Sequence, residues 1–274
     1  MMSNVELVIR ARKGWQPIDL WELWRYRELF GFLIWRDVRI RYSQTILGSV
    51  WAVAQPLLAM IVFTALFHRL AGLQSDGPPY PLFAFVGLTA WMFFSNAISA
   101  SAASLIGSQQ LISKVYFPRA LIPLAASGAF ALDLAVNLVF IGGMMAYYRW
   151  PLTANVMWMP FCLLGMWTAA AGVGLILAAL NVHYRDVKYA VPFFLQLGLF
   201  VTPIIYPLAK VPARLQLVMG LHPMAGIVET FRHALLGSTL NPWVIGESAL
   251  VTIAVLVLGL FLFRRMERRF ADVI

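Results

Sequence analysis

VWAVAQPLLAMIVFTALF, residues 50–67, contains no charged side chain and lies in an uncharged window between Arg41 and Arg69. A helix of about 20 apolar residues crosses the hydrocarbon core of a bilayer and satisfies its own backbone hydrogen bonds there. The whole chain has this character, since 61% of its 274 residues are hydrophobic and 12% are charged. Soluble proteins carry about a quarter charged residues, and a transmembrane barrel would show short alternating segments instead of long apolar runs. We therefore predict an all-α polytopic membrane protein.

Charge-free stretches predict six spans. They cover residues 50–67, 82–105, 121–147, 158–180, 189–206 and 249–263, the last of which is short unless it begins near residue 244. Between the fifth and the sixth, residues 207–246 are too polar and broken to span, although parts of this region are apolar enough to bury one face. Backbone of this kind is tolerated at membrane depth only where protein or a water-filled cavity surrounds it. We predict a re-entrant hairpin of two short helices there.

The Lys and Arg residues predict the orientation, because cytoplasmic segments carry an excess of positive charge. With six spans, 16 of the 21 Lys and Arg residues fall on the side that holds both termini, and five fall on the other side. Both termini of this multi-pass protein are thus predicted to lie on the cytoplasmic side of the inner membrane. The net charge of +9 is then an orientation signal and a contact for lipid headgroups, and it does not indicate nucleic acid.

The N-terminal segment, residues 1–45, precedes the predicted six-helix domain, residues 46–274, and has a pattern of its own. From Asp19, a suitable N-cap, apolar residues recur at helical spacing: Leu20, Leu23, Trp24, Leu29, Phe30, Leu33 and Ile34. Charged residues, mostly arginines, interleave with them. A basic, aromatic-rich amphipathic helix of this kind lies in the membrane interface. The alternative is a soluble helix that packs on a partner.

Several patterns of catalysis and metal binding are missing from the sequence. It has no GxxxxGK[ST] loop, no HExxH helix, no paired-cysteine metal spacing and no GxSxG elbow. The single Cys162 lies in an apolar run and reads as a small core residue. We therefore predict no catalytic, cofactor or metal site in this chain and expect that it is not itself an enzyme.

Asp133 is the only acid inside a clear span, where a charged carboxylate is expensive to bury. Asn137 follows one turn later on the same face and can hydrogen-bond to it, which would help to hold helices together. The alternative is a proton-coupled carrier, which would need further partners along a path. The spans also do not fall into the two similar halves of many secondary transporters. We expect a structural role for these two intramembrane polar residues.

Several separated motifs follow one another in the order found in a known family. WRDVRIRYSQTILG at residues 35–48 leads to Trp51 and to QPL at 55–57, followed by PLFAFVGL at 81–88, LISKVYFPR at 111–119, YRDV at 184–187 and TPIIYP at 202–207. From about Arg36 to the C-terminus the chain resembles the permease of ABC-2 type polysaccharide exporters, the family of O-antigen, capsule and teichoic acid transporters. One departure is His222-Pro223, where the resemblance leads us to expect Asn-Pro.

The resemblance implies a half-transporter with six spans. Two copies would form the channel, and two copies of a separate ABC ATPase subunit, which hold the ATP and Mg, would lie beneath it. Residues 109–119 would form the main coupling helix, and residues 183–188 a smaller contact. The residues implied in ATPase coupling are Gln109, Leu111, Lys114, Tyr116, Phe117, Pro118, Arg119, Tyr184, Arg185 and Asp186. The alternative is that the basic residues of both loops only anchor span ends by snorkelling.

Aromatic residues in and near the second span suggest a substrate path. The candidate channel-lining residues are Tyr80, Phe83, Trp91, Phe93 and Phe94. A flat ring offers an apolar face to the C–H side of a sugar while water serves the hydroxyls, which permits passage without tight binding. The alternative is lipid-facing packing or an interfacial aromatic belt.

We therefore expect the membrane-spanning permease subunit of an ATP-driven exporter of lipid-linked, O-antigen-like polysaccharide, with membrane lipid, a second copy and an ATPase as its partners. Efflux of a drug or a lipid through a related permease is the nearest alternative. A proton-coupled carrier that depends on Asp133 and a membrane-embedded transferase that depends on residues 207–246 are the alternatives from other classes.

Overall fold

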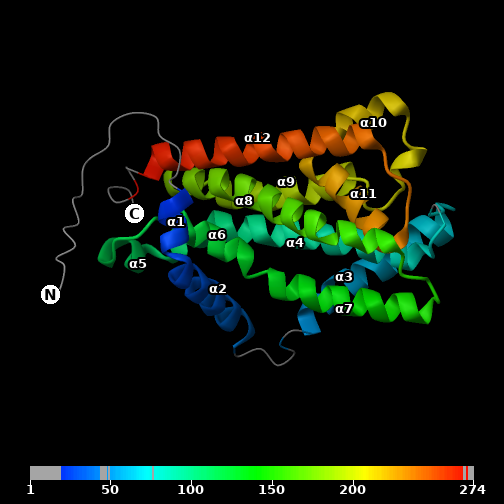
Figure 1. Cartoon of the computed structure of the whole chain (residues 1–274), viewed down its shortest axis with the longest axis horizontal. Helices are drawn as coiled ribbons and strands as arrows, with labels where there is room; N and C mark the ends of the chain where they lie inside the picture. Colours follow the sequence, from blue (N-terminus) through cyan, green and yellow to red (C-terminus); the bar gives the residue numbers. More distant parts are fainter. Residues whose placement is uncertain (1–19, 44–47, 49, 76, 268–269, 271–274) are drawn as a thin grey trace.

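The computed structural model of the chain describes residues 20–43, 48, 50–75, 77–267 and 270, which form helices and connections with no strand among them (Figure 1). The α-helices are α1 (Leu20–Arg25), α2 (Arg27–Tyr42), α3 (Val50–Phe63), α4 (Tyr80–Gly107), α5 (Gln109–Lys114), α6 (Leu121–Gly128), α7 (Ala131–Tyr147), α8 (Met159–His183), α9 (Val187–Val201), α10 (Ala213–Gly220), α11 (Pro223–Leu236) and α12 (Pro242–Glu267). A π-helical segment, Thr64–Leu70, extends α3, and short 3-10 segments cover Ala154–Trp158 and Leu208–Lys210. The predicted all-α class is confirmed.

Five helical stretches in this part of the chain are long and apolar enough to cross a membrane. They are Val50–Leu70, Tyr80–Gly107, Leu121–Tyr147, Ala154–His183 and Pro242–Glu267. The last stretch begins at Pro242, so it is long enough to cross the membrane, whereas the predicted range of residues 249–263 was short. The predicted fifth span corresponds to α9, whose 15 residues cover about 22 Å at ~1.5 Å per residue, less than the ~30 Å of a hydrocarbon core. The count of six spans therefore stays a prediction.

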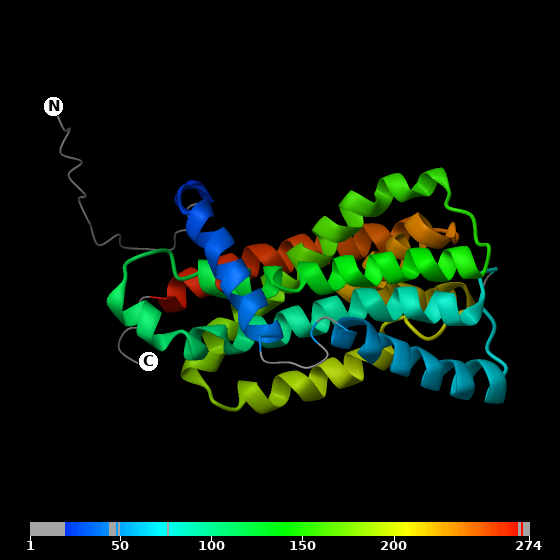
Figure 2. The ribbon, with the colours of Figure 1, turned by 90° about the horizontal axis from the view of Figure 1, so that it is seen from below.

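α4 lies inside the bundle, whereas α3 lies at its edge (Figure 2). The most apolar window of α4 is 78% buried, and that of α3 with its π-helical extension is 11% buried. α4 is apolar around most of its circumference, as expected of a helix that other helices surround. Its neighbours are α3, α6, α7, α8, α9 and α11. The outer faces of α3 and α9 instead expose large apolar side chains, among them Leu58, Ile61, Phe193 and Phe194.

α8 and α12 cross with their backbones in direct contact at Gly172 and Gly259. A Cβ atom on Gly259 would lie 2.5 Å from the carbonyl oxygen of Gly172, and one on Gly172 would lie 2.8 Å from the Cα of Leu256. Small residues allow membrane helices to approach closely, which matters because packing drives their association. This crossing fixes α12 along α8.

The predicted third span, residues 121–147, consists of two helices that meet at Ala129 and Phe130. Both helices pack on α4, but α6 also packs on α2 and α8, whereas α7 also packs on α3. Close contact with α2 marks the end of α6, since a Cβ atom on Gly128 would lie 3.1 Å from the Cδ1 of Ile34. The change of direction brings the start of α7, which carries Asp133, beside the end of α2.

The predicted N-terminal amphipathic helix is divided into α1 and α2 at Tyr26. One face of α2 packs on the bundle around Leu33, which is 1% exposed, together with Leu29, Phe30 and Ile34. The other face of the two helices exposes Trp21, Trp24, Phe32 and Trp35. Trp24, which the sequence groups with Leu29, Phe30 and Leu33 in one apolar set, thus lies on the exposed face of the two helices.

Exposed aromatic side chains beside arginines suit a membrane interface, and that location of α1 and α2 stays a prediction. The predicted N-cap, Asp19, and the predicted domain boundary at residue 45 lie outside the described residues.

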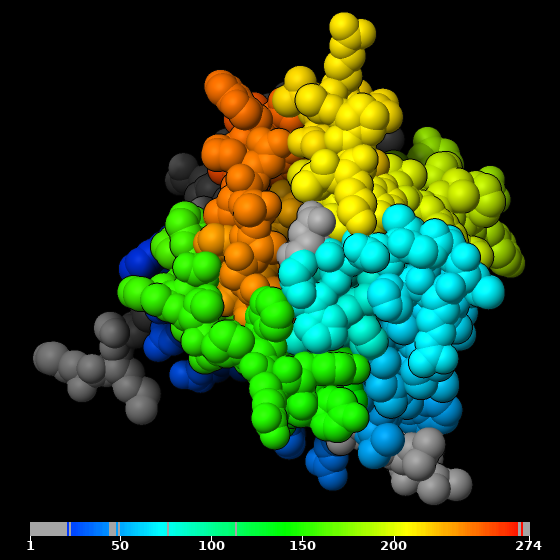
Figure 3. Space-filling view, turned by 90° about the vertical axis from the view of Figure 1, so that its right-hand side faces the viewer, coloured from blue at the N-terminus to red at the C-terminus, as the bar shows by residue number. Residues whose placement is uncertain are grey.

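α10 and α11 are the two short helices predicted within residues 207–246. Figure 3 shows the end of the bundle where α10 (yellow) lies beside the connection from α3 to α4 (cyan). The turn between them reaches the middle of α4, since the ring centroids of His222 and Trp91 lie 6.0 Å apart. Trp91 is about 16 Å along α4 from Tyr80 at ~1.5 Å per residue. This depth along the bundle suits a re-entrant hairpin, and its depth in the bilayer stays a prediction.

Candidate functional site

The two connections predicted to face an ATPase lie at one end of the bundle, opposite the end that carries α10 (Figures 1 and 2). α5 follows α4 there, and the connection of residues 184–186 joins α8 to α9. Both are close to the end of α12. Arg119 bonds to Glu267, and the ring centroids of His183 and Phe270 lie 6.1 Å apart. We call this region the α5 end and the opposite region the α10 end.

The predicted coupling residues divide into two groups by burial. The exposed group consists of Gln109, Lys114, Tyr116, Tyr184, Arg185 and Asp186. Tyr116 and Tyr184 are the large aromatic members, with exposed fractions of 67% and 62%. The other group is packed on the bundle: Phe117 and Pro118 are buried, and Leu111 and Arg119 are half-buried. Only the exposed group is free to touch another protein directly, and the coupling role of both groups stays a prediction.

Arg119 fastens the segment after α5 to the end of α12. Its backbone N–H donates to Glu267 Oε1 at 3.2 Å, and its Nη1 donates to the Glu267 carbonyl oxygen at 2.8 Å. Glu267 Oε2 also accepts from Arg264 Nη1 at 2.8 Å. Phe117 adds to this attachment because its ring lies in the same hydrophobic cluster as Phe263. These two residues therefore set the position of α5.

The candidate channel-lining aromatics are buried within the single chain, with exposed fractions of 2–6%. Tyr80 donates to the carbonyl oxygen of Ile205 at 2.9 Å, and the guanidinium carbon of Arg232 lies 3.6 Å from the ring centroid of Phe83. Trp91 packs so closely on α9 that a Cβ atom on Gly198 would lie 2.6 Å from it. Phe94 lies near His222, and Phe93 borders the cavity described below. Channel lining by these rings stays a prediction.

Asp133 pairs with residues at the end of α2. Arg41 Nη1 donates to Asp133 Oδ2 at 2.9 Å, and Tyr42 Oη donates to Asp133 Oδ1. The Arg41 guanidinium also lies over the ring of Phe130, 3.4 Å from its centroid. Burial lowers the pKa of Arg41, while the carboxylate opposes this shift and favours the charged form. The group ties α2 to α7.

Asn137 ties α7 to α3. Its Nδ2 donates to the carbonyl oxygen of Ala52 at 3.0 Å and to the backbone carbonyl of Asp133 at 2.9 Å. Asn137 therefore bonds to the predicted residue, Asp133, but to its main-chain carbonyl oxygen and not to its carboxylate. Both intramembrane polar residues make the contacts that a structural role needs.

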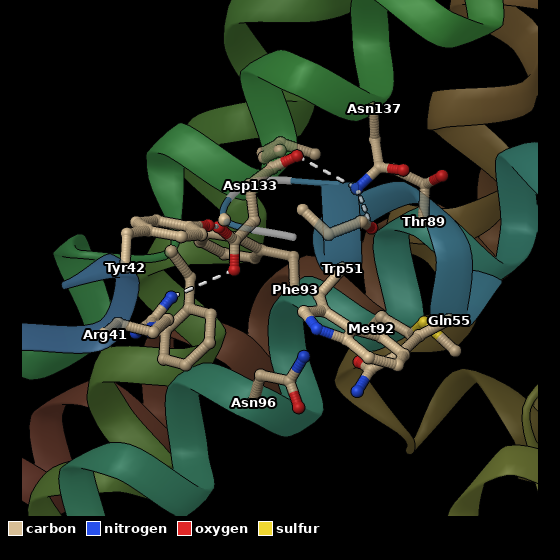
Figure 4. A pocket seen from close by; sticks show the side chains of 14 residues that line it. Arg41, Tyr42, Trp51, Gln55, Thr89, Met92, Phe93, Asn96, Asp133 and Asn137 are labelled. Carbon is tan, nitrogen blue, oxygen red and sulfur yellow. Dashed lines mark hydrogen bonds and ion pairs between the residues drawn. The ribbon is translucent and has the colours of Figure 1, made fainter. Parts of the chain in front are cut away.

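A cavity of about 280 Å³ lies where α2, α3, α4 and α7 meet (Figure 4). Its polar lining comes from all four helices: Arg41, Tyr42, Gln55, Thr89, Asn96, Asp133 and Asn137. Two polar atoms there are buried without a hydrogen-bond partner, Thr89 Oγ1 and Asn137 Oδ1. The side chains of Thr89 and Asn137 lie next to each other in Figure 4. Apolar walls are added by Trp51, Met92, Phe93, Phe130 and Leu134.

A second polar group lies at the α10 end around Arg232, which is 0% exposed. Its Nη1 donates to the carbonyl oxygen of Pro203 at 2.6 Å and lies 3.4 Å from Glu229 Oε1, and its Nη2 donates to the carbonyl oxygen of Ile204. α11 is thereby attached to the segment after α9. Burial of a charge is tolerated only with such a set of partners.

His222 caps α11, since its Nδ1 accepts from the backbone N–H of Met224 at 3.3 Å. An asparagine side chain satisfies the same orphan N–H group at a helix start. The departure from the expected Asn-Pro therefore keeps the cap chemistry. Burial lowers the pKa of His222 to about 4, so its ring is neutral and able to accept at neutral pH.

Sequence reasoning did not single out several of these residues. Arg232 counted toward topology alone, and Arg41 and Gln55 lay within motifs without a role of their own. Gln55 and Asn96 had an available signal, because an amide in an otherwise apolar span is costly in hydrocarbon. Arg232 had none, because its carbonyl partners are 28 and 29 residues away in the chain.

In a comparison with known proteins, residues 28–236 match one family, described as ABC-2 type transporter. The chain is 32% identical over 215 residues to the O-antigen export system permease protein RfbA of Myxococcus xanthus, across 77% of this chain and 81% of that protein. It is 29% identical over 243 residues to a protein of the same name from Klebsiella pneumoniae, across 87% and 92%. It is 23% identical over 240 residues to the polysialic acid transport protein KpsM of Escherichia coli, across 86% and 92%.

Proposed function

The chain belongs to the ABC-2 type transporter family, and from that premise we propose that it is the permease subunit of an exporter of lipid-linked, O-antigen-like polysaccharide, powered by ATP hydrolysis on a separate subunit. The observation that carries this proposal is the similarity, over most of the chain, to permeases named for O-antigen export. The similarity to a polysialic acid transport protein also favours a glycan over a drug. The helical spans suit a membrane subunit.

The ATPase partner docks on the α5 end. Support comes from the exposed group there, which combines two tyrosines with Lys114, Arg185 and Asp186. Aromatic and charged side chains on short connections are suited to a protein interface. Because the sequence lacks a nucleotide-binding loop of the GxxxxGK[ST] type, the ATP and Mg are held by that partner. The excess of Lys and Arg predicted on this side supports a cytoplasmic location for the α5 end and for both termini.

A second copy of the chain completes the channel. Within the described residues, the aromatics of α4 are packed against α9, α11 and the π-helical segment. In a single copy these rings therefore form part of the hydrophobic core. The exposed apolar faces of α3 and α9 leave surface for lipid or for another copy. Ligand sites are common at domain interfaces and between the helices of bundles, which supports a transport path between two copies.

Deletion of the chain in its host, followed by staining of surface glycan, tests this function. We expect surface polysaccharide to disappear and lipid-linked polymer to accumulate inside the cell, and expression of the intact chain to restore export. The purified chain should also co-purify with an ABC ATPase subunit. Normal surface glycan in the deletion strain, together with increased sensitivity to a drug or a detergent, would instead favour an efflux permease.

A further inference from the structure

The cavity between α2, α3, α4 and α7 contains polar atoms that the chain itself does not satisfy. Thr89 is 2% exposed and Asn137 is 5% exposed, yet Thr89 Oγ1 and Asn137 Oδ1 have no hydrogen-bond partner in the structure. Buried polar atoms are nearly always paired with protein or with an ordered molecule. Both atoms line the same cavity (Figure 4). The pair therefore indicates that a polar molecule occupies this space.

The cavity lies near the middle of the bundle. Thr89 is about 14 Å along α4 from Tyr80, and Asn96 is about 16 Å from Gly107, at ~1.5 Å per residue. Polar side chains at such depth are rare in membrane proteins and mark substrate pathways. Gln55 and Asn96 add two side-chain amides from α3 and α4 to the same lining.

The charges of the lining cancel within the cavity. Its two charged side chains, Arg41 and Asp133, are paired with each other at 2.9 Å. The Arg41 guanidinium also covers the ring of Phe130. No unpaired charge in this lining is therefore offered to a phosphate or to a carboxylate. The remaining groups are amides, two hydroxyls and aromatic rings, and they suit a neutral ligand that carries many hydroxyls.

The volume of about 280 Å³ is near the lower end of the range for small-molecule sites, about 300–1,000 Å³. It suits one or two sugar rings and not a long segment of polymer. Trp51 and Phe93 provide apolar ring surface on the walls, which can face the C–H side of a sugar.

We propose that this cavity is a binding site for a sugar unit of the exported glycan, and this inference rests on the function proposed above. Thr89 Oγ1 and Asn137 Oδ1 accept from sugar hydroxyls, and the amides of Gln55 and Asn96 donate to and accept from others. Trp51 lies against the apolar side of the ring. Uncharged hydrogen bonds of this kind hold a sugar without trapping it.

Photo-crosslinking in the complete transporter tests this site with the cell's own glycan as the probe. A photoreactive phenylalanine analogue replaces Trp51 in the cavity, and the matched control carries the same analogue at Phe161, an exposed aromatic residue on α8. We expect an adduct that an antibody to the surface glycan detects from position 51 and not from position 161. Absence of the adduct at position 51, in cells that still export glycan through this chain, would overturn the proposal.

Asn96→Leu and Gln55→Leu remove the amides at nearly constant volume. Each is expected to lower the yield of the position-51 adduct by about five- to tenfold, which corresponds to the loss of one hydrogen bond. Asn155→Leu, outside the cavity lining, is the matched control and should leave the yield within about twofold. An adduct that neither Asn96→Leu nor Gln55→Leu reduces would also contradict a sugar site.

Thr89→Val separates a binding role from a structural one. Because the hydroxyl has no partner in the chain, its replacement by a methyl group should leave the melting temperature unchanged or raise it, while the adduct yield falls. A lower melting temperature with an unchanged adduct would assign Thr89 to packing and contradict the site. If deletion of the chain leaves glycan export intact, the proposed function itself fails, which is a different result from any of these.

Discussion

The two ends of the bundle each hold an arginine, but in different ways. At the α10 end, Arg232 is 0% exposed and is surrounded by the backbone of Pro203 and Ile204 and by Glu229. At the α5 end, Arg119 is half-buried and reaches Glu267 at the end of a helix. A charge that is fully buried cannot leave its partners without a large free-energy cost, whereas one near water can. This difference predicts a rigid α10 end and an α5 end that can shift at a lower free-energy cost.

Arg232→Met should have the largest effect on stability. It removes the cation that pairs with the buried Glu229 and the bonds to two carbonyl oxygens. Breaking a buried pair in this way costs about 3–5 kcal/mol. We expect the melting temperature of the purified protein to fall by about 10 °C or more.

Arg214→Met is the matched control for that substitution, since Arg214 lies in α10 and is exposed. The free energy of unfolding should change by less than about 0.5 kcal/mol. Similar losses for Arg214→Met and Arg232→Met would remove the contrast between buried and exposed arginines on which the comparison of the two ends depends.

Asp133→Asn should have a smaller effect, because the Arg41–Asp133 pair is half-buried. The amide keeps an oxygen that accepts from Arg41 or Tyr42 but loses the negative charge. We expect a destabilisation of about 1–2 kcal/mol, measured by thermal unfolding, with export largely retained. Complete loss of export in a stable, assembled variant would contradict the structural role and revive proton coupling.

His222→Ala should cost about 1 kcal/mol, the usual value for a lost N-cap, whereas His222→Asn should keep the cap. Stability at low pH should also distinguish the histidine of the wild type from the asparagine of His222→Asn. The pKa of His222 is lowered to about 4 in the folded chain, below its usual value of ~6.5, so the unfolded chain takes up the proton first. Stability from this residue is present above pH ~6.5 and is lost as the pH falls toward 4.

Melting temperatures of the wild type and of His222→Asn between pH 7.5 and pH 4.5 measure this contribution. The wild type should lose stability relative to the asparagine variant across that range. Parallel pH profiles would show that the ring of His222 is not held neutral by burial.

Most of the fold follows from local pattern, because a span is a property of consecutive residues. The observed helices α3, α4, α8 and α12 match charge-free runs, and the two short helices appear where the chain is polar but partly apolar. The break at Phe130 and the one at Tyr26 were not predictable in this way. Each depends on packing against another element, as the contact of Gly128 with Ile34 shows.

The site was less predictable because its groups meet across the chain. Asp133 and Arg41 are 92 residues apart, and Arg119 and Glu267 are 148 apart. A pattern of nearby residues identifies such a residue as unusual but does not identify its partner. The family resemblance predicted which loops face an ATPase, and the structure then separated exposed Tyr116 from buried Phe117.

Tyr116→Ala should have the smallest effect on stability and a large effect on coupling. Its ring is 67% exposed, so the free energy of unfolding should change by less than about 0.5 kcal/mol. An interface aromatic residue often contributes about 2 kcal/mol or more to binding, so affinity for the ATPase subunit should fall about tenfold or more. Tyr147→Ala is the matched control, because Tyr147 ends α7 near the α10 end and is 81% exposed.

Quantitative co-purification of the ATPase subunit and export of glycan measure the difference between the two tyrosine variants. Phe117→Ala would not answer the question alone, since loss of a buried ring also loosens α5 from the bundle. If Tyr116→Ala and Tyr147→Ala retain the ATPase equally well, the α5 end is not its main docking surface. If only Tyr116→Ala fails to retain the ATPase while both variants melt at the wild-type temperature, the Tyr116 side chain contributes to binding of the partner and not to stability of the fold.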